Sequence, residues 1–139
     1  MDGKHIYLKD WDWDVFVFFE ARGEDTETIL DFMREAGCRF PERRKEAVHL
    51  LSGEPNTGMT YSNYRNRMSV MVIGHTTSAD EFQSTYDHEK GHLAMHIAQA
   101  DCIDPFGEEF EYLSGEIGRQ LFDKARIYMC ETCRKKIGL

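Results

Sequence analysis

The side chains best suited to chemistry lie together in the segment YDHEKGHLAMHIAQ, residues 86–99. The groups of interest in this segment are three histidines at four-residue spacing and one glutamate, namely His88, His92 and His96 with Glu89. On an α-helix, residues that are four apart lie one turn apart on the same face, about 40° from each other. The imidazoles of His88 and His92 could therefore reach one metal ion at the roughly 2.0–2.1 Å that is typical of Zn–N bonds.

Glu89 lies about 100° around the same helix from His88, beside such an ion rather than on it. A carboxylate in that position can take a proton from a water molecule that the ion polarises. The pattern His-Glu-x-x-His on a helix is the signature of zinc proteases, so the segment predicts a zinc site with Glu89 as the general base. The alternative is a polar helix face that carries two unrelated histidines.

A catalytic zinc ion needs a third protein ligand and an open position for water. His96 lies about 12 Å along the helix axis from His88, which is too far for one shared ion. We therefore expect His96 to be a core residue or a residue that orients a ligand through a hydrogen bond.

The acids of the last predicted helix supply better candidates for the third ligand, and they are Glu108, Glu109, Glu111 and Glu116. We prefer Glu111, because small residues follow it on nearby turns and would let the two helices lie close together; these are Ser114, Gly115 and Gly118. Glu108 is the second choice, since an acid at the start of a helix is already explained by the helix dipole.

A helix over Ser78–Ala100 must carry the histidines, and two independent patterns predict it. Ser78 and Glu81 form a capping box, and an apolar stripe follows at helical spacing with Phe82, Tyr86, Leu93 and Ile97. The residues CIDPFG break this helix. A last long helix is predicted over residues 108–129, begun by Asp104 and Pro105.

The N-terminal half predicts further elements. Residues 5–23 contain two strands, and residues 25–38 and 41–53 have the pattern of helices that end at Gly37 and Gly53. Residues 54–63 are rich in turn formers, and Arg67–Ile73 is a strand that is apolar on both faces. The sequence thus predicts an α+β fold in a single domain of 139 residues.

The composition argues against several classes of partner. Seventeen basic and 25 acidic residues give a net charge of 17 minus 25, or −8, which would repel nucleic-acid phosphates. No segment approaches the roughly 20 apolar residues of a membrane span, and the charged N-terminus lacks a signal peptide. We expect no nucleic-acid or membrane partner and a cytoplasmic location.

The four cysteines are expected to be reduced in that compartment. Cys130 and Cys133 form a lone Cys-x-x-Cys, whereas Cys38 and Cys102 are not paired in sequence. A structural zinc site usually needs two such pairs. The preferred interpretation is therefore small, partly buried residues near a helix end, and a metal site is the alternative.

From residue 67 onward the chain resembles the gluzincins, the zinc peptidases that combine HExxH with a glutamate ligand. Thermolysin-like enzymes carry Glu-x-x-Ser-x-x-x-Gly around that glutamate, and EYLSGEIG repeats the pattern here, with eighteen residues between His92 and Glu111. The chain is similar as well to small single-domain zincin-like proteins, including minigluzincins and immunity-repressor proteases. It departs from thermolysin-like enzymes at Gly115, where they carry an aspartate.

This resemblance implies a zincin-like fold, with residues 67–139 as the metallopeptidase core and residues 1–66 of uncertain role. It implies Zn²⁺ held by His88, His92 and Glu111, a bound water whose pKa falls toward ~7, and proton transfer by Glu89. A peptide or protein substrate would pair with an edge strand, assigned to Arg67–Ile73, and His75 just beyond it could donate to the oxyanion. Many stand-alone domains of this kind belong to phages or prophages, so the host cell would be bacterial.

Two other hypotheses remain open. The zinc ion could staple helices in a catalytically silent module, with His96 or a cysteine closing the fourth position. Alternatively, the protein could bind no metal and use Trp11 and Trp13 as exposed anchors for a protein partner. Packing of both tryptophans across the first hairpin is the simpler interpretation of those residues.

Overall fold

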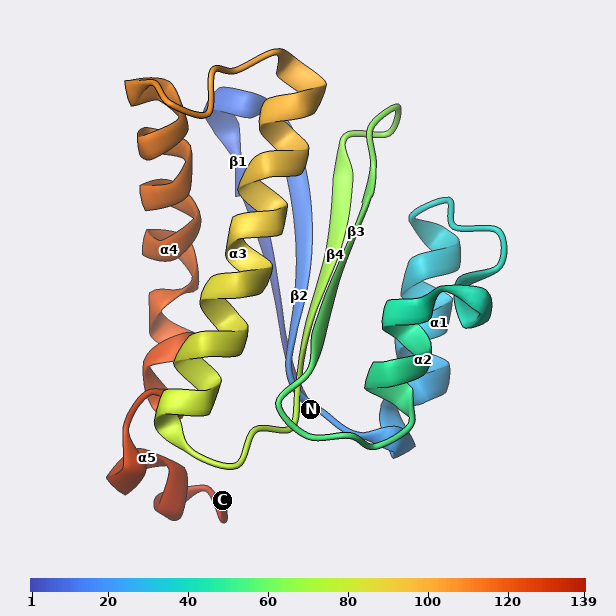
Figure 1. Ribbon diagram of the computed structural model, residues 1–139, viewed down its shortest axis with the longest axis vertical. Coiled ribbons are helices and arrows are strands. Elements are labelled where there is room, and N and C mark those ends of the chain that lie inside the picture. Colours follow the sequence, from blue (N-terminus) through green and yellow to red (C-terminus); the bar gives the residue numbers. More distant parts are fainter.

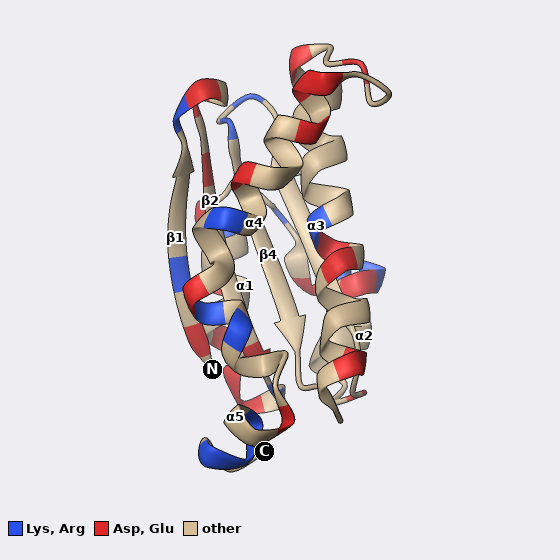
Figure 2. Cartoon of the chain, turned by 90° about the vertical axis from the view of Figure 1, so that its left-hand side faces the viewer, with Lys and Arg blue, Asp and Glu red and all other residues tan.

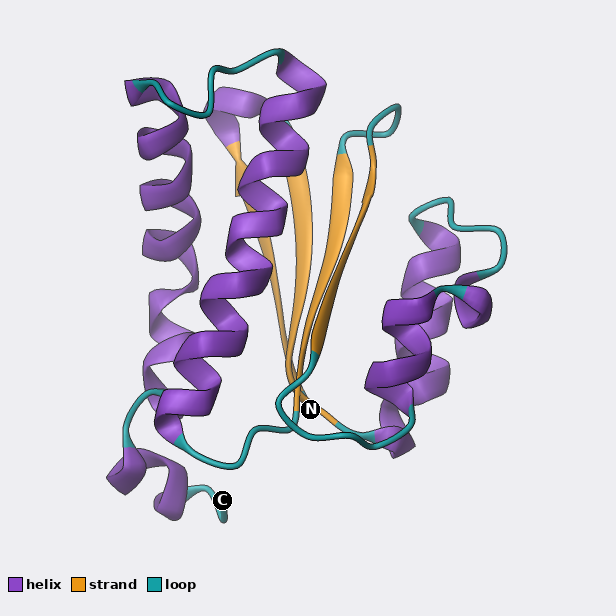
Figure 3. Ribbon diagram, viewed as in Figure 1, coloured by secondary structure: helices purple, strands orange, loops and turns teal.

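The computed structural model describes residues 1–139, and it places four strands between two groups of helices (Figures 1 and 3). The strands are β1 (Asp2–Leu8), β2 (Trp13–Ala21), β3 (Gly58–Asn63) and β4 (Met68–Gly74). The α-helices are α1 (Thr26–Glu35), α2 (Lys45–Leu51), α3 (Ala79–Asp101), α4 (Glu108–Tyr128) and α5 (Glu131–Lys136). Short 3₁₀ turns lie at Lys9–Trp11, Gly23–Asp25 and Pro41–Arg43. The predicted α+β fold class is confirmed.

The sheet has the strand order β1-β2-β4-β3. The central pair β2 and β4 is parallel, whereas β1 and β3 pair with it antiparallel at the two edges. Strands that are covered on both faces are largely apolar, and β4 is buried from Ser69 to Gly74 with Ser69 as its one polar side chain. One sheet therefore contains strands from both halves of the chain.

Two hydrophobic cores lie on opposite faces of this sheet, because side chains alternate along a strand. On β2, the side chains of Val15, Val17 and Phe19 pack against α3 and α4. Phe18 of the same strand packs with the helices α1 and α2 on the other face. Fully burying a side chain of this size stabilises a fold by roughly 1.5–3 kcal/mol, so both layers hold the sheet in place.

Helix α3 forms as its sequence predicts. The Oγ of Ser78 accepts a hydrogen bond from the backbone N–H of Glu81, which caps the first turn. The predicted apolar stripe is buried, with Phe82, Tyr86, Leu93 and Ile97 each at most 1% exposed. The helix ends at Cys102, which has the left-handed φ of 54°.

The start of α4 differs from the prediction. The helix begins at Glu108 with Gly107 as its N-cap, not at Asp104 and Pro105. Asp104 instead forms a separate turn, in which its carboxylate accepts from the N–H of Phe106 and its carbonyl accepts from the N–H of Gly107. These local bonds use up the Asp104 acceptors before the helix starts.

The expectation of turns throughout residues 54–63 is wrong, because Gly58–Asn63 forms strand β3. This strand pairs with β4 in a register from Gly58 opposite Ile73 to Asn63 opposite Met68. The apolar strand β4 needs hydrogen-bonding partners on both of its edges, and β3 covers the one that β2 leaves open. Arg67–Ile73 is therefore not an edge strand, and β3 takes the edge instead.

Trp11 and Trp13 are 8% and 0% exposed, so the hypothesis that they are exposed anchors is wrong. Both belong to the core beneath α3 and α4. The indole N–H of Trp13 donates to Oγ of Ser69 across 2.8 Å, which satisfies its only polar group. None of the helices has both the length and the apolar composition that crossing a bilayer requires.

Candidate metal centre

His88 and His92 lie one turn apart on α3, and both are exposed. Their Nε2 atoms are 3.0 Å apart, and the two rings meet edge to face with centroids 4.6 Å apart. With Glu89 they form the one group of three potential metal ligands in this structure, whose ligand atoms all lie within 4.8 Å of one another. The structure thus brings together the three residues of the HExxH motif.

The separation of the two nitrogens fits one shared ion. Two nitrogens bonded to zinc at roughly 2.0–2.1 Å with a tetrahedral angle lie about 3.3 Å apart. The observed 3.0 Å is close to that value. A hydrogen bond between the two neutral rings gives the same distance, so one proton can occupy the place that a metal ion would take.

Glu89 differs from the two histidines because it is only 3% exposed. Burial raises the pKa of its carboxyl, and this effect outweighs the opposing effects of the hydrogen bond from Thr60 and of the neighbouring His92 and His88. The hydroxyl of Thr60 on β3 donates to Oε2 of Glu89 across 3.1 Å. A carboxylate that is held in place and has a raised pKa is suited to act as a general base.

Gly58 explains how Glu89 fits against the edge strand. A Cβ atom at Gly58 would lie 2.8 Å from Cγ of Glu89 and 2.8 Å from the carbonyl oxygen of Val72. Only a residue without a side chain allows β3 to approach α3 this closely. Gly58 lies in the segment that was expected to form turns, but a glycine beside strand-forming residues can also mark such a close approach.

A polar cavity of about 370 Å³ opens beside His88 and Glu89, between α3, the start of β3 and α2. No hydrophobic residue lines it; its walls are Glu46, His49, Asn56, Thr57, Gly58, Ser84, Thr85, His88 and Glu89. Glu46 and His49 come from α2, on the far side of the β3 edge from α3 (Figure 1). The N-terminal half of the chain therefore contributes acidic and imidazole groups to the cavity.

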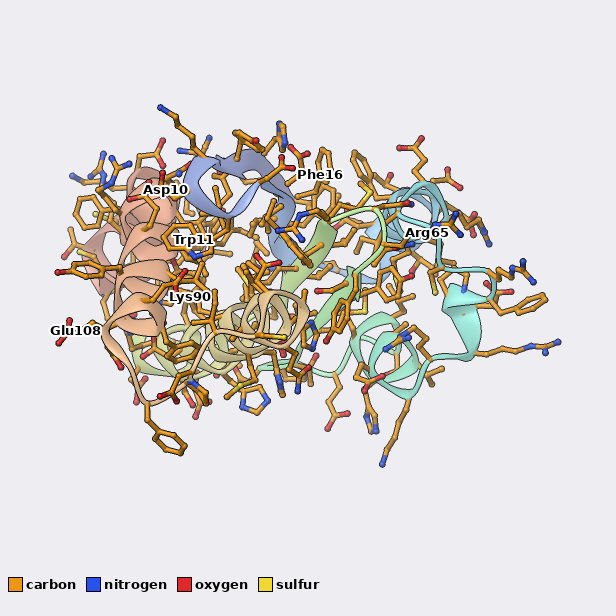
Figure 4. The ribbon with its side chains drawn as sticks, turned by 90° about the horizontal axis from the view of Figure 1, so that it is seen from above. Asp10, Trp11, Phe16, Arg65, Lys90 and Glu108 are labelled. Carbon is orange, nitrogen blue, oxygen red and sulfur yellow. The ribbon has the colours of Figure 1, made fainter.

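The structure does not bring Glu111 to the histidine pair. Glu111 is exposed in the first turn of α4 and stands outside the group of ligand atoms. Helix α4 covers another flank of α3, where Ser114 shares a cavity with Lys90 and Gly91. Viewed from above, Lys90 lies between these two helices, and Glu108 points away from the molecule (Figure 4). The expectation that small residues of α4 bring the two helices close is not met, because a Cβ at Gly115 would meet nothing within 4 Å and one at Gly118 only Nζ of Lys90 at 3.9 Å.

His75 is likewise separate from the pair. Its backbone N–H donates to the carbonyl of Ala21 at the end of β2, which turns the residue toward that strand. Its ring bonds to the carboxylate of Glu20 and lies 3.1 Å from the guanidinium of Arg22. This cluster borders a different cavity, which does not include His88 or Glu89.

His96 is half-buried and stands outside the group of ligand atoms. Its Nδ1 lies 2.7 Å from Oγ of Ser62 on β3. Burial, followed by the neighbouring His92, lowers the pKa of its imidazole. His96 is therefore engaged with the sheet, in keeping with the expectation that it is not a zinc ligand.

The cysteines do not build a second metal cluster. Cys130 caps α5, and its Sγ accepts a hydrogen bond from the N–H of Cys133 across 3.4 Å. Cys38 is buried and Cys102 is exposed, and no disulfide forms. The basic residues that follow, Arg134 to Lys136, make α5 one of the positively charged segments (Figure 2).

Comparison with protein-family models found no match, and neither the curated proteins nor the solved structures yielded one. The likeness to gluzincins thus depends on the motif residues themselves.

Proposed function

We propose that this protein is a zinc-dependent metallopeptidase that holds one Zn²⁺ through His88 and His92 and uses Glu89 as its general base. One observation carries the proposal. Two exposed Nε2 atoms lie 3.0 Å apart beside a buried, hydrogen-bonded carboxylate, on the edge of a polar cavity. A polar helix face that only contacts solvent would not explain why the carboxylate of Glu89 is buried.

The division of labour follows from the positions of the side chains. Zinc, when bound, supplies a Lewis acid that makes water a nucleophile near neutral pH. Glu89 takes the proton of that water and passes it to the leaving amine of the cleaved peptide. Thr60 fixes the position of the carboxylate through its hydrogen bond to Oε2.

We propose Glu46 as the third ligand in place of Glu111. Glu46 lines the same cavity as His88, and its charge is among the influences that raise the pKa of Glu89, so the two carboxylates lie near each other. It is exposed and, like Glu111, stands outside the group of ligand atoms, so α2 has to move for Glu46 to reach the ion. The other candidate on α2, His49, is already bonded to Glu54 across 3.1 Å. Zinc would thus draw α2 toward α3.

The substrate in this proposal is an extended peptide that pairs with β3. This strand is at the sheet edge, so one side of its backbone is open to a partner, whereas β4 is paired on both sides. Main-chain pairing of this kind supplies affinity with little dependence on sequence. The start of β3 lines the cavity beside His88 and Glu89, which would bring a paired peptide past these residues.

The first experiment measures zinc in protein purified without added metal. We expect close to one equivalent, and we expect the His88→Ala/His92→Ala variant to contain none. A metal-free wild-type protein that also fails to take up added zinc would overturn the proposal.

The second experiment screens peptide and protein substrates for cleavage, with Glu89→Gln as the control. This variant keeps both histidines and the shape of the acid, so it should retain zinc and lose hydrolysis. Full zinc occupancy together with no cleavage would favour the alternative of a catalytically silent zinc module. Equal cleavage by Glu89→Gln would overturn the role of Glu89 as the general base.

A further inference from the structure

A line of hydrogen bonds crosses the sheet from the buried Trp13 to His96. Nε1 of Trp13 on β2 lies 2.8 Å from Oγ of Ser69 on β4. That hydroxyl lies 2.7 Å from Oγ of Ser62 on β3, which in turn lies 2.7 Å from Nδ1 of His96 on α3. Three strands and helix α3 thus share one polar connection, which ends beside the proposed metal site.

The chemistry of the groups fixes the direction of this line. An indole N–H can only donate, so Ser69 must accept from Trp13. Ser69 is fully buried, and the only other polar side chain within reach of its hydroxyl is Ser62. Its proton therefore goes to Ser62. When Ser62 donates in turn to Nδ1 of His96, every hydroxyl proton of the line has an acceptor within the protein. Nδ1 is then an acceptor, and the neutral ring of His96 carries its proton on Nε2.

The Nε2 atom of His96 faces outward. It has no hydrogen-bond partner in the protein, and no buried polar side-chain atom in this structure lacks a partner, so Nε2 must be accessible to solvent. The ring follows His92 by one turn of α3, with ring centroids 6.2 Å apart. An N–H group of fixed polarity is therefore presented next to the pair of histidines.

We propose that His96 binds the carbonyl oxygen of the substrate through its Nε2–H and stabilises the negative charge that develops on it. The role as a donor depends on the zinc peptidase function proposed above, whereas the tautomer does not. Trp13 is the residue that determines the tautomer of His96, because its indole N–H fixes the direction of the hydrogen bonds. In the opposite tautomer, Nε2 of His96 would offer a lone pair and could compete for the metal ion. The hydroxyl groups that run from Trp13 to His96 favour the tautomer in which Nε2 is a hydrogen-bond donor.

The tautomer can be tested in the metal-free protein. Long-range ¹H–¹⁵N spectra should show Nδ1 of His96 as an unprotonated nitrogen and Nε2 as a protonated one, in a single tautomer. In Ser69→Ala, which keeps Trp13 in the core but interrupts the line, a mixture of tautomers should appear. A protonated Nδ1 in the wild-type protein, or identical spectra in the variant, would overturn the proposal.

The role as donor can be tested in the zinc-loaded protein. His96→Ala should lower kcat by roughly 10²-fold with little change in KM and none in zinc affinity. His96→Gln should recover part of the loss, because its amide N–H can donate. Loss of zinc from His96→Ala, or an unchanged kcat, would overturn the donor role.

The two proposals fail in different ways. If the wild-type protein hydrolyses no peptide, the proposed function and the donor role both fall. If it hydrolyses peptides but His96 has the wrong tautomer, only the inference about His96 falls.

Discussion

The hydroxyl of Thr60 lies 3.1 Å from the carboxylate of Glu89, and this contact joins the outermost strand of the sheet to the helix that carries the histidines. The same hydroxyl lies 3.3 Å from the backbone carbonyl of Glu89. The orientation of the proposed base therefore depends on where β3 lies. Since β3 is also the strand with an open edge, a peptide that pairs with it would touch the element that positions the base.

Replacing Thr60 by valine should lower kcat about tenfold without changing the zinc content. Valine has the shape of threonine but no hydroxyl, so the Glu89 carboxylate would lose its donor and its fixed orientation. Steady-state kinetics and metal analysis of the same preparation measure both quantities. Thr60→Ser is the matched control, because it keeps the hydroxyl and should retain most of the activity. Equal kcat values for the valine and serine variants would contradict this role for Thr60.

Gly58→Ala should reduce both stability and activity. The added Cβ would lie 2.8 Å from Cγ of Glu89 and from the backbone oxygen of Val72, and a backbone oxygen in a strand pair cannot easily move. Overpacking of this kind costs about 1–3 kcal/mol, which urea unfolding would detect.

Gly91→Ala is the control for that substitution. Gly91 lies in the same helix as the histidines, and nothing stands within 4 Å of a Cβ built on it. Alanine favours an exposed helix position over glycine by roughly 1 kcal/mol, so this variant should be more stable than the wild type. A Gly58→Ala protein as stable as the wild type would show that β3 and α3 are not in close contact.

Local patterns were sufficient to predict the helix that carries the site. The Ser78 cap and the apolar stripe of α3 depend on residues within a few turns, and both are observed. The 3.0 Å approach of His88 to His92 follows from the same helix geometry. The fold class needed only the alternation of strand and helix patterns along the chain.

The partners of that helix could not be predicted in the same way, because they depend on which flank of α3 each neighbour covers. Lys90 and Gly91 face α4, so an acid on α4 such as Glu111 lies on the wrong side of the helix. Strand β3 could not be predicted because glycine and asparagine lie at its two ends, next to other turn formers, and only its pairing with β4 reveals the strand. Residues 1–66, which had no assigned role, supply Thr60 and the wall formed by α2.

Alkaline pH should destabilise the fold through Tyr128. Burial, and after it the nearby charges of Asp2 and Glu20, raise the pKa of this phenol from 10.0 to about 12. The folded state thus holds the proton more tightly than the unfolded chain does. This stabilisation is complete below pH 10 and is lost as the pH rises from about 10 to 12, by roughly 1.4 kcal/mol per pH unit.

Urea unfolding at several pH values measures this effect, and Tyr128→Phe is the comparison. The phenylalanine keeps the stacking on Phe19 and Phe82, whose ring centroids lie 5.6 and 5.2 Å from that of Tyr128, and has no proton to lose. Its stability should fall less steeply above pH 10. Parallel curves for the two proteins would contradict the assignment to Tyr128.

The third zinc ligand can be identified by comparing Glu46→Gln with Glu111→Gln. Both glutamates are exposed and stand in the first turn of a helix, so the two substitutions should have similar, small effects on the fold. Only Glu46 lines the cavity beside His88. We expect Glu46→Gln to weaken zinc binding about tenfold or more, which corresponds to a loss of about 1.4 kcal/mol or more. We expect Glu111→Gln to leave zinc binding unchanged. Competition with a chromogenic chelator measures both affinities. The reverse result would mean that α4 rather than α2 completes the site. An exposed glutamate that does not bind zinc should tolerate replacement by the neutral glutamine without a change in zinc affinity.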